Sequence, residues 1–277
     1  MLCEPGQILL SNQDTRPVQA IRNNIYQHQW AKTMQLTYIP LLQLQRDFYA
    51  KPRGFDRFWE YIRTMTNAQT GDLELPLVAM NPMGKEHLLP YLERLLEMDA
   101  DGIGARATEE AALRLVHVAG DFQVTTVVSD DLMGGWTNRY VSEFKHRFET
   151  RAYDRRGWIA PILWSSQTYS AEQVDREVRT AIFRLAYIIQ HGYAQNLGEM
   201  LQQEGYAMAA AGQIEPQLDE DDLLYTQQVL APYRAMSGEP IVIPALYGDA
   251  AAHELGYAPL GLSLRAGLAL ALHEARI

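Results

Sequence analysis

The sequence predicts an α/β fold: a mostly parallel sheet with helices on both faces, plus an N-terminal helical segment packed against it. Two observations predict it. From residue 75 onward, short apolar runs alternate with amphipathic stretches, as expected of successive βαβ units. Residues 15–67 instead carry apolar side chains at helical spacing, without a run typical of a strand. We expect that segment to cap the sheet or to add a layer to it.

The domain organisation follows from the same change of pattern. No linker rich in proline or serine separates the two parts. We therefore expect residues 1–70 to form a helical segment integrated with an α/β domain of residues 71–277. A chain of 277 residues buries enough surface to fold without disulfides or metals.

Four apolar runs are predicted to be strands of one sheet: 75–80, 123–128, 158–164 and 241–246. The second run is β-branched almost throughout, which favours a buried strand. Neither Pro76 nor Pro161 can donate to a ladder, so we expect Pro76 at a strand start or an edge and Pro161 at an edge or a bulge. Residues 103–106 are either a short strand or a turn. The predicted helices are 15–38, 41–48, 55–65, 85–97, 108–116, one from 137 or 138 to 148, 170–203, 219–234 and 262–275.

The amino-acid composition limits the classes of binding partner and the cellular compartment that we expect. The net charge is −10, which disfavours nucleic acid because phosphate binders carry a basic face. The most basic stretch, Arg147 to Arg156, is interrupted by Glu149 and Asp154, so we expect a solvated helix end there. The single cysteine excludes an intrachain disulfide and fits the cytoplasm. The most apolar segment, 260–272, is too short and too interrupted to span a membrane.

The turn after the second predicted strand is the strongest candidate for a site. Asp130 and Asp131 end that strand, and Gly134 and Gly135 follow. In open α/β sheets, ligands bind outside the carboxyl ends of the strands, where helix N-termini also point. We therefore expect Asp130 and Asp131 to be catalytic and the turn as far as Arg139 to form the wall of the principal pocket. The alternative is that these carboxylates only cap the helix or pair with Arg139. The predicted ligand-binding residues of this turn are Trp136, Thr137, Asn138 and Arg139.

The turns after the other predicted strands add further candidates. Asn81 and Lys85 could hold an anion at a helix start, and Ser165 lies in a hydroxyl-rich turn. Asp249 and His253 are four residues apart, which on a helix puts a carboxylate beside an imidazole. We assign His253 a catalytic role and Asp249 a ligand-binding one. Ordinary helix caps and a solvated ion pair are the structural alternatives.

The motifs of several well-known sites do not occur. No H-E-x-x-H spacing supports a zinc site, no G-x-S-x-G supports a serine nucleophile, and no strand is followed by G-x-G-x-x-G. The sequence therefore assigns no metal and identifies no cofactor.

Two classes of function are compatible with these features. The first is an enzyme that acts on a small metabolite bearing phosphate or carboxylate, bound at the carboxyl edge of the sheet. The second is a non-catalytic binding or scaffold protein, whose aromatic N-terminal helices and apolar tail contact a partner or further copies in a homo-oligomer. A concave pocket with an aspartate facing a cation would favour the enzyme.

Overall fold

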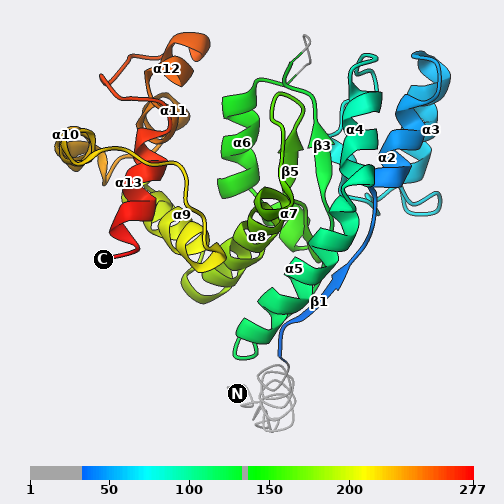
Figure 1. Cartoon of the computed structure of the whole chain (residues 1–277), viewed down its shortest axis with the longest axis horizontal. Helices are drawn as coiled ribbons and strands as arrows, with labels where there is room; N and C mark the ends of the chain where they lie inside the picture. The colour runs from blue at the N-terminus through cyan, green and yellow to red at the C-terminus, as the bar shows by residue number, and fades with distance from the viewer. Residues whose placement is uncertain (1–32, 133–136) are drawn as a thin grey trace, which may run out of the picture.

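The computed structural model describes residues 33–132 and 137–277, in which helices dominate and the sheet is small and parallel (Figure 1). The strands are β1 Gln35–Tyr38, β2 Asp121–Val124, β3 Val127–Ser129, β4 Trp158–Ile159 and β5 Ile162–Trp164. The helices of the first half are α2 Leu42–Tyr49, α3 Phe55–Met65, the 3₁₀ turn η1 Leu77–Ala79, α4 Leu88–Glu97, α5 Ala100–Arg114, α6 Arg139–Phe148 and α7 Arg151–Asp154. Those of the second half are α8 Ala171–His191, α9 Leu197–Ala211, α10 Glu220–Leu230, η2 Ala231–Tyr233, α11 Glu239–Tyr247, α12 Asp249–Leu255 and α13 Ala266–Glu274.

The strands form two small parallel sheets. One has the order β1-β2-β4, and the other pairs β3 with β5. Thr125 N donates to Ile159 O at 3.0 Å, and Val127 N donates to Pro161 O at 3.0 Å, so hydrogen bonds continue across the gap. The predicted strands 123–128 and 158–164 are thus confirmed, each with a short interruption. Pro161 lies at the second interruption, as its missing N–H predicts.

The prediction of four sheet strands was wrong for the other two runs. Residues 241–246 belong to α11, and 75–80 contain only η1. Residues Val242 to Tyr247 are buried on every side of α11. A helix buried all round is apolar at every position, so its sequence shows no helical periodicity and resembles a buried strand. The sheet is smaller than predicted, and the expected cover of helices on both faces remains a prediction.

The N-terminal segment also departs from its prediction. Gln35–Tyr38 is β1, an edge strand paired with β2, although we expected helix there. The helices predicted at 41–48 and 55–65 are present, and residues 15–32 lie outside the described part of the chain. Residues 103–106 are inside α5, and the long helix predicted from 170 to 203 is two helices, α8 and α9, separated at Gly192.

Three apolar clusters hold the elements together. The β3–β5 ladder packs with α2, α3 and α4, whereas β2 and β4 pack with α5 and α8. The third cluster joins α6 and α9 to α11 and α13, on the other side of α8 in Figure 1. Among the described residues, no helix combines the length and the hydropathy that a membrane span requires.

Candidate functional site

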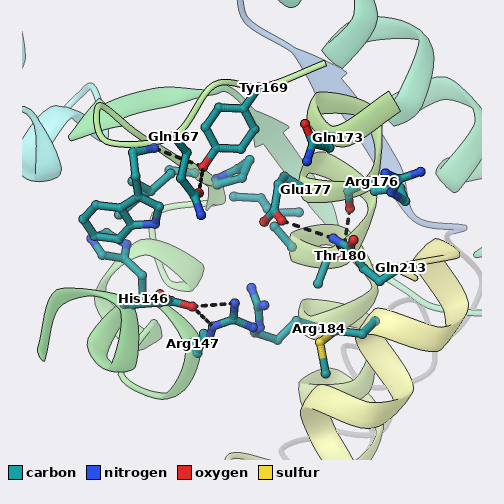
Figure 2. Close-up of a pocket in the computed structure, with 18 of the residues that line it drawn as sticks. His146, Arg147, Gln167, Tyr169, Gln173, Arg176, Glu177, Thr180, Arg184 and Gln213 are labelled. Carbon is teal, nitrogen blue, oxygen red and sulfur yellow. Dashed lines mark hydrogen bonds and ion pairs between the residues drawn. The ribbon is translucent and has the colours of Figure 1, made fainter. Parts of the chain in front are cut away.

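A cavity of about 600 Å³ opens beside β4 and β5, the strands at the edge of both ladders (Figure 2). Helices α6 and α7 form one side, α8 forms the opposite side, and residues 213–216, after α9, also line it. The cavity volume is typical of a site for a small molecule.

One face of α8 supplies a row of polar side chains. Gln173, Glu177, Thr180 and Arg184 follow one another at steps of three or four residues, so they share one side of the helix. Ser170 fixes where α8 begins: its hydroxyl accepts from the Gln173 amide, and the Gln173 side chain accepts from the Ser170 amide. The cap therefore sets the position of the row along the cavity.

The guanidinium groups of Arg147 and Arg184 lie close together at one end of this space (Figure 2). Both donate to the carboxylate of Glu204, which is fully buried; Arg184 does so through two nitrogens, at 2.6 and 3.0 Å. Burial alone would raise the pKa of Glu204, but the two guanidiniums lower it to about 2. Glu204 therefore stays ionised and holds both arginines in place.

A second buried carboxylate, that of Glu143, extends the network. Arg147 donates to it at 2.7 Å, Arg265 donates to both of its oxygens, and Arg139 lies 3.7 Å away. These guanidiniums overcome the effect of burial and hold the pKa of Glu143 well below its usual range. Arg265 itself has a left-handed backbone, with φ of 59°, directly before α13.

The network has more cations than anions in direct contact. The four guanidiniums of Arg139, Arg147, Arg184 and Arg265 share the three carboxylates of Asp131, Glu143 and Glu204. Nη1 of Arg184 donates to no residue within the described part of the chain. With four guanidiniums on three carboxylates and a donor of Arg184 left over, this end of the cavity carries a net positive charge and suits an anionic group.

The rest of the cavity wall carries neutral polar groups, the carboxylates of Glu177, Asp154 and Glu215, and the guanidinium of Arg176. The Tyr169 hydroxyl donates to Gln167 Oε1 at 2.6 Å, and burial raises the pKa of Tyr169 well above its usual value. The Gln213 amide donates to both Glu177 and Thr180, at 3.2 Å each. These groups offer hydrogen bonds to the polar part of a ligand.

His146 lines the cavity beside the arginines (Figure 2). Burial, aided by the charge of Arg184, lowers its pKa to about 4. The imidazole is therefore neutral at pH 7. Its ring packs on Tyr153, with the centroids 5.7 Å apart.

The predicted strand-end residues form a separate cluster. Asp130 is 1% exposed, and its Oδ1 accepts from Ser165 Oγ at 2.9 Å and from Leu132 N at 3.2 Å, and lies 2.8 Å from His87 Nε2. Burial would raise the pKa of Asp130, but these hydrogen bonds outweigh it and lower the pKa. The strand end thus keeps an ionised aspartate whose bonds come from the chain itself.

Asp131 is bound in the same way. It accepts from Ser166 N at 2.8 Å, from Ser166 Oγ at 2.6 Å and from Arg139 Nη1 at 3.1 Å. Arg139 also lies over the ring of Trp164, 5.2 Å from its centroid. Arg139 therefore connects the strand-end cluster to the cavity, which both it and Trp164 line.

Of the predicted site residues in the described part, Arg139 alone lines the cavity, and Trp136 lies outside that part. The structure brings Asp130, Asp131 and Ser165 together, but not on the cavity wall. Of the described residues of the turn from Asp130 to Arg139, predicted to form the wall of the principal pocket, only Arg139 lies on the cavity wall, and residues 133–136 are outside the described part. The catalytic roles of Asp130 and Asp131 stay predictions.

The remaining predicted residues have local partners or are exposed. Asn138 caps α6 by accepting from Val141 N at 3.1 Å, and Asn81 accepts from Met83 N at 2.9 Å. Asp249 accepts three backbone hydrogen bonds, from residues 260–262. Thr137 is half-buried, and Lys85 and His253 are exposed. Asp249 and His253 lie on a helix that follows α11, so the prediction that they follow a sheet strand was wrong.

Sequence reasoning missed the charged residues of the cavity. The stretch from Arg147 was interpreted as solvated, but the Arg147 side chain is 11% exposed. Glu143 and Arg147 at a four-residue spacing, and Arg184 inside an apolar stretch of α8, were signals for a buried ion pair.

Compared with protein-family models, with curated proteins and with solved structures, the chain matches none.

Proposed function

We propose that this protein binds a small metabolite bearing a phosphate or a carboxylate in the cavity beside β4 and β5. The observation that carries the proposal is the pair Arg147–Arg184, which the ionised Glu204 holds at one end of a space of about 600 Å³. Guanidinium groups fixed by carboxylates are already oriented, so little side-chain freedom is lost when an oxyanion binds.

A catalytic role is the second candidate, and His146 favours it. The neutral imidazole lines the same cavity as the guanidiniums. It could therefore accept a proton from a ligand bound there. An anion bound at Arg147 and Arg184 would offset the charge of Arg184 and so raise the pKa of His146 toward neutrality. An NMR titration of His146 with and without inorganic phosphate measures that rise. An unchanged pKa with phosphate bound would count against catalysis by His146.

Calorimetric titration with inorganic phosphate and with 3-phenylpropanoate tests the proposed binding. Gln167→Glu puts a carboxylate at the cavity while keeping the acceptor for Tyr169. At several ångströms this charge should weaken binding of either anion roughly tenfold. Gln228→Glu, an exposed position on α10 that is not on the cavity wall, is the matched control.

The proposal predicts binding that weakens with salt and with Gln167→Glu but not with Gln228→Glu. If neither anion binds, or if both variants bind as the wild type does, the cavity is not an anion site.

A further inference from the structure

We infer that the cavity takes an amphoteric ligand, in which a protonated amine binds Glu177 while the oxyanion binds Arg147 and Arg184. The inference rests on the proposed anion site and adds the class of ligand. Three features carry it: a carboxylate in the cavity with no cationic partner among the described residues, its place on the same helix face as Arg184, and the apolar wall between the strands and α8.

Glu177 points into the cavity in Figure 2. The hydrogen bond that it accepts is from the neutral Gln213 amide, at 3.2 Å. In residues 33–132 and 137–277, no lysine, arginine or histidine nitrogen lies within 4.0 Å of its carboxylate. Glu143 and Glu204, in contrast, are each bound by at least two arginines.

The two charged ends lie along one helix face. Glu177 and Arg184 are seven residues apart on α8, which is about two turns or roughly 10 Å along the axis. Both line the cavity, as does Thr180 between them. A ligand on this face therefore meets a cationic group at one end and an anionic group at the other.

A purely anionic ligand would leave Glu177 without a counter-charge and place a like charge near it. An ammonium group removes both penalties, because it donates to the carboxylate and neutralises it. The opposite charges of the cavity thus favour a ligand that carries both signs.

The rest of the cavity wall accommodates an apolar body. Trp158, Ile162 and Trp164 come from the strands, and Leu185 and Ile188 come from α8. These aromatic and aliphatic side chains give the cavity an apolar surface beside its charged and polar groups. A phenyl or similar group on the amphoteric ligand would contact it.

Two matched pairs of probes test the amine directly. L-phenylalanine differs from 3-phenylpropanoate, and O-phosphoethanolamine differs from ethyl phosphate, by an ammonium group. We expect at least one amphoteric probe to bind the wild type about tenfold more tightly than its deaminated partner, the range of one charge-assisted hydrogen bond. Glu177→Gln should remove that preference and leave or improve binding of the deaminated probe. The control is Glu172→Gln, an exposed residue of the same helix that does not line the cavity.

The possible results separate the two proposals. If the deaminated probes bind as tightly as the amphoteric ones, or if Glu177→Gln keeps the preference, the inference is wrong and the anion site stands. If no probe binds, both fail. Binding of 2-phenylethylamine, which lacks the carboxylate, with a loss in Glu177→Gln would place the amine at Glu177 independently.

Discussion

The cavity beside β4 and β5 and the cluster at the end of β3 both contain carboxylates and arginines, but they differ in how these charged side chains are paired. Asp130 and Asp131 accept hydrogen bonds from serines, backbone amides and Arg139, all from the chain itself. In the cavity, Arg184 keeps a nitrogen without a partner among the described residues, and Glu177 has no cationic one. The two strand-end carboxylates thus have their donors within the chain, although His87 Nδ1 and Ser129 Oγ beside them are buried without a hydrogen-bond partner in the described part. The Glu177 carboxylate of the cavity, in contrast, has no cationic partner there.

This difference separates a structural use of charge from a binding use. A satisfied network adds rigidity, since each buried carboxylate has its donors, and removal of one partner leaves another unpaired. Groups left unsatisfied around an open space instead gain when a ligand arrives. Carboxylates at a strand end are therefore weaker evidence for a site than charged side chains that face a cavity.

Glu204→Gln should have the largest effect on stability. It leaves Arg147 without one carboxylate and Arg184 without its ion pair in a buried environment. We expect a loss of about 3–5 kcal/mol in the free energy of unfolding, measured by urea denaturation. Glu172→Gln, at the exposed start of α8, should change it by less than about 0.5 kcal/mol. Equal, small losses in both variants would contradict a structural role for Glu204.

Asp130→Asn separates the two regions. The amide keeps the shape but weakens the bonds from His87, Ser165 and Leu132 N, so unfolding should become easier by about 1–3 kcal/mol. Binding of phosphate or 3-phenylpropanoate should stay unchanged, as measured by calorimetry on the folded variant. A folded Asp130→Asn protein with lost anion affinity would instead support the site predicted at the strand end.

His146, which lines the cavity, should make the free energy of unfolding depend on pH. Burial lowers its pKa from 6.5 to about 4, so between these values the unfolded chain binds the proton more readily than the folded protein. The contribution is constant above pH 6.5 and falls as the pH decreases toward 4. His146→Gln should flatten this part of the profile, which urea denaturation at successive pH values measures. An identical slope in both proteins would show that another group is responsible.

Arg139→Lys should have the smallest effect, because lysine keeps the positive charge. Arg139 belongs to both regions, so the variant tests their connection. An ammonium keeps the positive charge at the cavity but cannot bond Asp131 and Ser166 while also lying flat on Trp164. We expect anion affinity to fall by less than about tenfold, or 1.4 kcal/mol. Arg139→Ala should weaken binding further, and unchanged affinity in that variant would remove Arg139 from the site.

Local sequence determined the elements whose signals are local. The predicted helix starts near residues 170 and 138 agree with α8 and α6, where Ser170 and Asn138 are the observed caps, because a cap needs only its own helix. The β-branched run from Val124 predicted the central strand segment, and Pro161 predicted an interruption. These predictions hold because the physics that decides them acts over a few residues.

Tertiary structure decided the rest. The run 241–246 resembles a strand in sequence, yet the surrounding cluster of α6, α9 and α13 buries it on all sides as a helix. Gln35–Tyr38 is a strand because it pairs with the edge of β2. The local sequence does not indicate this pairing. The cavity depends most on packing. Arg147, Arg184 and Glu204 come from three helices separated by long stretches of chain, so only the contacts between α6, α8 and α9 bring their charges together.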